Sequence, residues 1–412
     1  MDANHPHGKW SRLCGFPGRA APDDAAWALL GLVAVAAAAN GVWRALHGGS
    51  DFPGFHRAAR SVWTASDLSL DDAVRRYLPA FRILLAPLGA LALPWACALW
   101  QALNLAALAA TPRALERLSG IPRREQLLAF AAVAPFLFDS FALGQSAPLL
   151  LWLVTEGLAL ARVGRASSGG ALIAAAALVK IVPALFLAVP AVLRRAWRTA
   201  LGAGSALVAL AILSTAIVPL RDSAGASVVW WREVSHSQAP WDLVASGRAL
   251  RHTNQGLGVV LARTLTDVSA ARARGKVQLA SIPSAWAWRI YGAILTALAA
   301  GWLAGAVRAR RLESARAWLG MQALTAIAML AASPIVWPHY FAWLLPALLF
   351  LHPRRRAVLA CGAGAWLAIA LPPARALGFH MFLSLGLFAA VLRELWRAEE
   401  RTSADLDRLA RG

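Results

Sequence analysis

The sequence predicts an all-α polytopic membrane protein, a bundle of about twelve transmembrane helices whose loops on the outer face carry the polar residues. Of the 412 residues, 59% are hydrophobic and only 15% are charged, whereas a soluble domain typically carries about 25% charged residues. Apolar stretches recur from end to end, at about the 20-residue length that a bilayer-spanning helix needs. A soluble chain of this length would divide into domains joined by polar linkers, and the sequence contains none.

Twelve apolar segments account for the predicted helices. They are Trp27–Leu46, Ala80–Ala110, Gln126–Phe141, Ala147–Arg162, Ser168–Lys180, Val182–Arg194, Thr199–Pro219, Ser284–Arg308, Arg316–Ala332, Pro338–Leu351, Val358–Leu371 and Leu377–Trp396. The second is long for one crossing, and Pro87 and Pro94 allow a hairpin instead. Lys180 and Pro183 divide another apolar run into two short helices.

Arginine clusters at the ends of these segments predict the orientation. The clusters are Arg113, Arg117, Arg123 and Arg124; Arg162 and Arg165; Arg194, Arg195 and Arg198; Arg308, Arg310, Arg311 and Arg316; and Arg354, Arg355 and Arg356. The positive-inside bias places them all in the cytoplasm if the Ala80–Ala110 segment crosses once and the chain turns outward at Lys180. Both termini are then cytoplasmic. A hairpin at Pro94 would invert the part before it or after it.

In a soluble protein, a net charge of +20 would suggest binding to nucleic acid. Because the arginines lie at the ends of apolar runs, where they orient a membrane protein and meet anionic lipid, we expect membrane lipid and no nucleic acid as a partner. The Ala- and Arg-rich composition suggests a bacterial protein, and we expect it in the inner membrane. The three cysteines lack a metal-type spacing, so neither a disulfide framework nor a metal site is predicted, and no cofactor is expected.

The orientation gives a predicted domain organisation. Residues 1–24 form a cytoplasmic tail, residues 25–396 the transmembrane domain, and residues 397–412 a second cytoplasmic tail. Residues 47–79 form a first outer loop and residues 220–283 a large outer loop. A cleaved signal peptide is the alternative for the first helix.

Asp51 in the first outer loop is the candidate catalytic residue. A carboxylate near the membrane surface can serve as a general base, and the alternative is a helix N-cap. His56 and Arg57 can bind an anion beside it or lie in solvent. Tyr77, before Pro79, can line a groove that enters the bilayer.

Two further polar residues fall at turns on the predicted outer side. Gln145 can hydrogen-bond a ligand hydroxyl or satisfy helix-end carbonyls. Lys180 interrupts an apolar run, and such a residue usually faces a cavity or a partner, because exposing it to lipid costs about 2.5–3.5 kcal/mol. The alternative for Lys180 is snorkelling to the interface.

The remaining candidates lie in the second half of the chain. His252, Asn254 and Gln255 precede a short apolar helix and form either a cap or a sugar-binding edge. His339 can donate to a phosphate oxygen, with Tyr340 beside it, and an interfacial His-Tyr pair is the alternative. Together these residues form a predicted site for an anionic, hydroxyl-rich ligand.

The order of these motifs resembles glycosyltransferase family 87, multi-spanning mannosyltransferases of the GT-C type that use polyprenyl-phosphate sugars. The matching residues are Asp51-Phe52 with Arg57-Ala58-Ala59, Tyr77-Leu78-Pro79 leading to Leu85-Ala86-Pro87-Leu88, Gly144-Gln145, Lys180 with Pro183, Asn254-Gln255, and Ser333-Pro334 with Trp337, His339 and Tyr340. They extend from about residue 50 to about residue 345. The pattern departs from the family's at Gly144-Gln145-Ser146, where no asparagine follows, and at Tyr77-Leu78-Pro79-Ala80, which lacks adjacent prolines.

The resemblance implies that Asp51 is the catalytic base, that the anomeric carbon is inverted and that a lipid phosphate is the leaving group. The donor is then a polyprenyl-phosphate sugar, with mannose the expected sugar, and the acceptor is a hydroxyl of a glycolipid or glycan. In this hypothesis Lys180, His339 and Arg57 hold the phosphate, and Gln145, Asn254 and Gln255 bind sugar hydroxyls. The alternatives are a transporter or flippase for lipid-linked sugars and a non-catalytic membrane scaffold.

Overall fold

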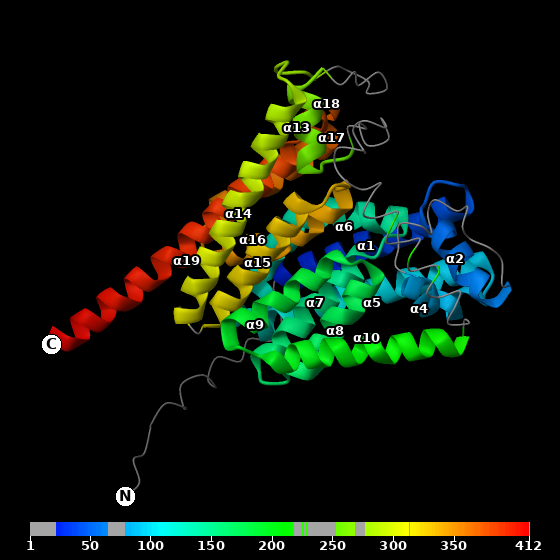
Figure 1. The fold of residues 1–412 in the computed structure, drawn as a ribbon, viewed down its shortest axis with the longest axis horizontal. Helices are drawn as coiled ribbons and strands as arrows, with labels where there is room; N and C mark the ends of the chain where they lie inside the picture. The colour runs from blue at the N-terminus through cyan, green and yellow to red at the C-terminus, as the bar shows by residue number, and fades with distance from the viewer. Residues whose placement is uncertain are drawn as a thin grey trace, which may run out of the picture.

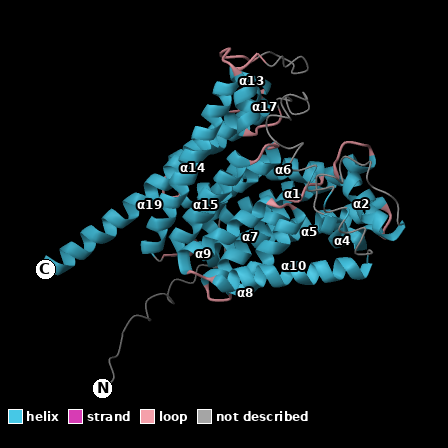
Figure 2. Ribbon diagram, viewed as in Figure 1, coloured by secondary structure: helices cyan, strands magenta, loops and turns pink. Residues whose placement is uncertain are grey.

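A computed structural model describes residues 22–64, 79–217, 253–267, 277–312 and 314–411, with three isolated positions between residues 218 and 252. Every regular element in this part of the chain is a helix, as Figure 2 shows, and none is a strand. Together with the apolar composition, this confirms an all-α polytopic membrane protein.

Figure 1 shows the helices in chain order. In the first half they are α1 Pro22–Leu46, α2 Phe52–Thr64, α4 Pro79–Gly89, α5 Leu93–Ser119, α6 Arg123–Leu143, α7 Ala147–Arg162, α8 Ala166–Val179, the 3₁₀ helix η1 Val182–Leu187, α9 Ala188–Arg194 and α10 Trp197–Ile217. In the second half they are α13 Leu257–Leu265, α14 Ser284–Leu312, α15 Ala315–Ala332, the 3₁₀ helix η2 Pro338–Leu344, α16 Leu345–Phe350, α17 Arg355–Ala370, α18 Pro372–Ala376 and α19 Phe379–Arg411.

Six helices in the described part are long and apolar enough to cross a bilayer. They are Asp23–Leu46, Leu93–Ser119, Arg123–Leu143, Ser284–Leu312, Ala315–Ala332 and Phe379–Arg397. Shorter apolar helices accompany them, including the bent pair η1 and α9, in which Pro183 and Pro190 interrupt regular hydrogen bonding. The count of twelve crossings and the domain boundaries stay predictions.

The single helix predicted over residues 80–110 is wrong, because the chain forms two helices there, α4 and α5. At 11 residues, or about 17 Å, α4 is too short to cross a hydrocarbon core of about 30 Å. It packs instead on α2: a Cβ at Gly89 would lie 2.4 Å from the Ala59 carbonyl carbon, and Trp63 Nε1 donates to the Ala86 carbonyl at 2.6 Å. Since α4 does not cross, the sides predicted for the later helices are unchanged.

Three arginine clusters that are far apart in sequence meet at one end of the bundle. Arg117 pairs with Glu156, Arg162 Nη1 donates to the Arg117 carbonyl at 2.8 Å, and Arg194 Nη1 donates to the Arg162 carbonyl at 2.7 Å. We call this the basic end. Its location in the cytoplasm stays a prediction.

The helix α15 runs through the centre of the molecule and packs against α5, α7, α9, α14, α16 and α19. Most of its side chains are buried, and the amide of Gln322 donates to Thr155 Oγ1 of α7 at 2.7 Å. A buried polar pair of this kind fixes the position of α15 relative to α7. The segment that follows α15, residues 333–340, is therefore presented by a rigid scaffold at the end opposite the basic end.

Candidate functional site

The turn between α6 and α7 places Gln145. The helix α6 ends at Gly144, whose φ of 67° is the left-handed conformation that glycine adopts most easily. The backbone N–H of Gln145 donates to the Ser140 carbonyl at 2.8 Å, and Trp100 Nε1 of α5 donates to the Gly144 carbonyl at 2.9 Å. The turn is thus held from two sides, and Gln145 is 4% exposed.

The loop between α1 and α2 places Asp51 against this turn. The Leu143 carbonyl accepts from the Asp51 backbone N–H at 3.0 Å and from Ser50 Oγ at 2.9 Å. A Cβ at Gly144 would lie 2.7 Å from Phe52 Cβ and 2.9 Å from Ser50 Oγ. The glycine is therefore required twice, for its φ and for the close approach of the loop.

Four side chains from separate segments form one hydrogen-bonded chain, which we call the Asp51 cluster. Gln145 Nε2 donates to Asp51 Oδ2 at 2.6 Å, and Gln145 Oε1 accepts from Lys180 Nζ at 3.1 Å. Lys180 Nζ also donates to the Tyr340 hydroxyl at 3.0 Å and lies 4.3 Å from the centre of its ring. Asp51 is exposed, so the cluster is open to solvent at the carboxylate.

The position of Lys180 follows from the break between α8 and η1. The helix α8 ends at Val179, Lys180 has extended backbone (φ −143°, ψ 130°), and η1 begins at Val182 with Pro183 in its first turn. The break predicted from the lysine and the proline is therefore present. Neither hydrogen-bond partner of the ammonium, an amide oxygen and a phenol, is negatively charged. The lysine is thus equipped to attract an anion.

Beside the cluster, His339 forms a pair with Asp139. His339 Nδ1 lies 3.5 Å from Asp139 Oδ2, the imidazole is 1% exposed, and its ring centre lies 4.7 Å from that of Tyr340. At 3.5 Å the contact is too long for a good hydrogen bond. Asp139 was not among the predicted site residues, although a carboxylate inside the apolar helix α6 was a usable signal.

Of the remaining predicted residues of the two outer loops, His56 and Arg57 lie on α2, the helix that follows Asp51. His56 is buried and contacts the Leu91 carbonyl through Nε2 at 2.9 Å, which fastens α2 to the connection between α4 and α5. Arg57 is exposed on α2. Tyr77 and His252 lie outside the described residues.

Asn254 and Gln255 are fully buried, and their side chains hydrogen-bond to backbone groups. Asn254 Oδ1 accepts from the N–H groups of Gly256 at 3.0 Å and Val336 at 3.1 Å, and Gln255 Nε2 donates to the Arg375 carbonyl at 2.6 Å. These contacts favour the cap interpretation over the sugar-binding edge.

The same region is stabilised by a buried arginine. Arg263 donates to the Ala376 carbonyl at 2.8 Å and to the Asn254 carbonyl at 3.1 Å. Burial lowers the pKa of Arg263 to about 10, so the guanidinium keeps its charge at neutral pH.

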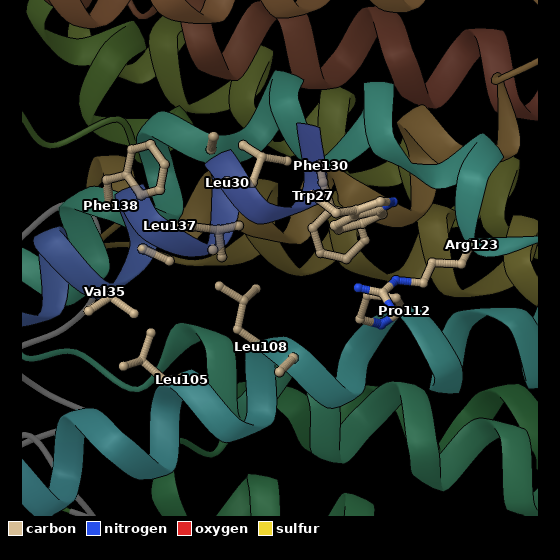
Figure 3. Close-up of a pocket in the computed structure, with 14 residues that line it drawn as sticks. Trp27, Leu30, Val35, Leu105, Leu108, Pro112, Arg123, Phe130, Leu137 and Phe138 are labelled. Carbon is tan, nitrogen blue, oxygen red and sulfur yellow. The ribbon is translucent and has the colours of Figure 1, made fainter. Parts of the chain in front are cut away.

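An apolar cavity of about 280 Å³ lies between α1, α5 and α6 (Figure 3). Trp27, Leu108 and Phe138 contribute to its lining, and Arg123 lies at one end, 5.0 Å from the Trp27 ring. None of the predicted site residues lines it. Within the described part of the chain, no three His, Cys, Asp or Glu side chains gather as metal ligands, and the expectation that no metal is needed stays a prediction.

The comparison with models of protein families shows which family the chain belongs to. The model of glycosyltransferase family 87 matches residues 76–334, more than half of the 412 residues. The chain belongs to glycosyltransferase family 87. Neither a curated protein nor a solved structure matches it.

Membership of family 87 makes the chain a membrane-embedded glycosyltransferase, with a sugar donor and an acceptor. The matched range contains Gln145 and Lys180 but begins after Asp51 and ends before His339 and Tyr340. The structure connects the two sets, because Gln145 contacts Asp51 and Lys180 contacts Tyr340.

Proposed function

We propose that the protein is an inverting glycosyltransferase that moves a sugar, mannose by preference, from a polyprenyl-phosphate donor to an acceptor hydroxyl of a glycolipid or glycan. One observation carries the proposal: the amide of Gln145 joins the carboxylate of Asp51 to the ammonium of Lys180. A base for the acceptor and a cation for the leaving phosphate thus lie one amide group apart. The displacement needs the base at the attacking hydroxyl and the cation at the leaving phosphate.

In the proposed reaction, Asp51 takes the proton of the acceptor hydroxyl while the oxygen of that hydroxyl forms a bond to the anomeric carbon. The bond from that carbon to the phosphate oxygen breaks, and the polyprenyl phosphate leaves with the electron pair. Lys180 balances the charge on the phosphate, so no separate acid is required. Attack from the face opposite the leaving group inverts the anomeric carbon.

Tyr340 and His339 extend the phosphate site in this proposal. Tyr340 fixes the ammonium of Lys180 by a hydrogen bond and by its ring face. Within the described residues, neither ring nitrogen of His339 has a hydrogen-bond partner. We assign Nε2 to a phosphate oxygen of the donor, and Asp139, beside Nδ1, the role of orienting the ring.

Of the other predicted ligands, Arg57 lies on the exposed face of α2 and fits a role at the mouth of the site. We place the Asp51 end outside a bacterial inner membrane and both termini in the cytoplasm, because the arginines gather at the other end.

The rival functions make different demands on the structure. A flippase needs a polar pathway from one side of the membrane to the other, whereas the Asp51 cluster lies at one end and most of the buried side chains of α15, at the centre of the molecule, are apolar. A non-catalytic scaffold needs no exposed carboxylate beside a cation. Transfer is thus the better supported function.

The proposal is tested by incubating the purified full-length protein in proteoliposomes with labelled polyprenyl-phosphate mannose and an acceptor extract of the source membranes. We expect label in a new glycosidic product with the anomeric configuration opposite to that of the donor. Labelled lipid that crosses the bilayer without bond formation would support the flippase. Absence of both transfer and donor binding would support the scaffold.

A further inference from the structure

The basic end of the bundle contains a hollow that the proposed function does not use. It lies where α9 meets α14 and α15 (Figure 1) and has a volume of about 750 Å³. Its described lining includes Arg194 and Arg195 from the end of α9, Arg310 and Arg311 from the end of α14, and Trp318 from α15. Segments more than a hundred residues apart in sequence therefore direct four arginines at one space.

No described residue that lines the hollow is acidic. Three described carboxylates at the same end are paired elsewhere: Glu156 with Arg117, Glu125 with His352, and Glu394 with Arg354 and Arg397. Arg195 and Arg310 bring like charges to one concave space, where they repel one another, and an anion bound between them relieves the repulsion.

Two of the lining arginines, Arg195 and Arg310, differ from neighbouring arginines in their contacts. Arg308 Nη2 donates to the Trp396 carbonyl at 3.0 Å, and Arg316 lies 5.0 Å from the Phe350 ring, so both are turned onto the protein. Within the described residues, the guanidinium groups of Arg195 and Arg310 form no hydrogen bond or ion pair. The positive-inside bias explains the presence of arginine here, but it does not explain this difference.

The backbone at Arg195 is also unusual. Its φ of 49° makes it the only non-glycine residue with positive φ in the described part of the chain, at a helix end where glycine is the common residue. The left-handed turn ends α9 so that Arg194 lies over Trp318, at 5.8 Å, while Arg195 also lines the hollow. An arginine thus occupies a position where glycine would be less strained.

The wall of the hollow is amphiphilic. Val307, which lines it, is 57% exposed and lies on the same face of α14 as the exposed Leu303. Because α14 is a candidate membrane-spanning helix, we expect this exposed apolar face beside the hollow to meet lipid. A small soluble anion would use the arginines but not this apolar wall.

We propose that the hollow binds the phosphate headgroup of an anionic phospholipid from the leaflet at the basic end, with the acyl chains along the exposed face of α14. Guanidinium groups bind phosphate oxygens through paired hydrogen bonds, and basic pockets between transmembrane helices are suited to such headgroups. This inference is independent of the sugar-transfer proposal.

The test uses the full-length protein in a neutral detergent, titrated with phosphatidylglycerol, phosphatidylcholine or inorganic phosphate, with bound lipid counted by native mass spectrometry. The variant is Arg195→Gln/Arg310→Gln. The matched control is Arg355→Gln/Arg356→Gln, which removes the same charge from exposed positions in another arginine cluster. We expect phosphatidylglycerol to bind the wild type in preference to phosphatidylcholine and to bind the variant about 30-fold more weakly. The control is expected to bind like the wild type.

Three results would overturn the proposal: equal loss in variant and control, equal binding of both lipids, or displacement of phosphatidylglycerol by an equal concentration of inorganic phosphate. Thermal unfolding of each variant shows whether it is folded. If the double variant does not fold, Arg310→Gln alone replaces it, with an expected loss of about fivefold.

Discussion

Two amide-bearing regions of this molecule look alike in sequence and differ in structure. Gln145 uses both atoms of its amide to contact charged side chains, Asp51 and Lys180, in a cluster open to solvent. Asn254 and Gln255 are fully buried, and their side chains hydrogen-bond to backbone groups of Gly256, Val336 and Arg375. An amide that lies between two charged side chains in an open cluster can contact a ligand. An amide that hydrogen-bonds to buried backbone groups stabilises the fold. We therefore expect substitutions in the first region to reduce activity and those in the second to reduce stability.

The largest effect is expected from Asp51→Asn. The substitution keeps the shape of the side chain but removes the base, so sugar transfer should fall by about 10²–10⁴-fold with an unchanged unfolding temperature. The measurement is the initial rate of label transfer per folded protein. Asp267→Asn, at an exposed position beyond α13, is the control and should transfer at the wild-type rate. Near-normal transfer by Asp51→Asn would remove Asp51 as the base.

Lys180→Met should come next, with a loss of about 10²–10³-fold, because it removes the charge that stabilises the leaving phosphate and keeps an apolar stem of similar length. Lys180→Arg keeps the charge but changes its geometry, and we expect it to recover part of the rate. The rates are compared at saturating donor. If Lys180→Met reduces only the yield of folded protein, the lysine is structural.

Two glycines distinguish the effect of backbone strain on stability from the effect of site geometry on the transfer rate. Gly144 and Gly120 both end helices in the left-handed conformation, with φ of 67° and 74°. Alanine at either position should cost about 1–2 kcal/mol of stability. At Gly144 the new Cβ would also meet Phe52 at 2.7 Å, whereas at Gly120 nothing lies within 4 Å.

We therefore expect Gly144→Ala to lower the transfer rate, because it displaces the loop that carries Asp51, and Gly120→Ala to lower only the unfolding temperature. Thermal unfolding and transfer rates of the two variants, measured side by side, check this. Equal rates would mean that the position of Asp51 does not depend on the turn.

The smallest effect on activity is expected in the second region. Asn254→Ala leaves the buried N–H groups of Gly256 and Val336 without their acceptor, so the free energy of unfolding should fall by about 1–3 kcal/mol. The transfer rate per folded molecule should stay within about twofold of the wild type, because the side chain touches no member of the Asp51 cluster. Gln145→Ala is the counterpart and should show the reverse pattern. A large fall in rate for Asn254→Ala, without a change in stability, would restore the sugar-binding interpretation.

The sequence predicts most of the bundle, because hydropathy and arginine clusters follow directly from the bilayer as a solvent. It left open whether the chain divides within residues 80–110, where Pro87 and Pro94 allowed a hairpin. The chain divides between Gly89 and Leu93, with Pro94 in the first turn of α5, and Gly89 packs closely against Ala59. Such a contact joins segments whose approach the local sequence does not encode.

Most of the candidate site was also predictable from the sequence. Asp51, Gln145, Lys180 and Tyr340 were predicted from polar residues at the ends of apolar runs, and they lie in one hydrogen-bonded chain. Asp139 was not predicted, because its place in the site depends on His339, a residue two hundred positions later that only the fold brings beside it.

The difference between Gln145 and Asn254 could not be resolved from sequence either. Both precede a helix at the same predicted side of the membrane. The acceptors and donors around each amide come from segments that only the fold brings together.

The most direct test of the account is a structure, by electron cryo-microscopy, of the Asp51→Asn variant with polyprenyl-phosphate mannose bound. We predict a donor phosphate at about 2.7–3.2 Å from Lys180 Nζ, with the anomeric carbon between the phosphate and residue 51. A donor phosphate bound elsewhere, with Lys180 still hydrogen-bonded to Gln145 and Tyr340, would contradict it.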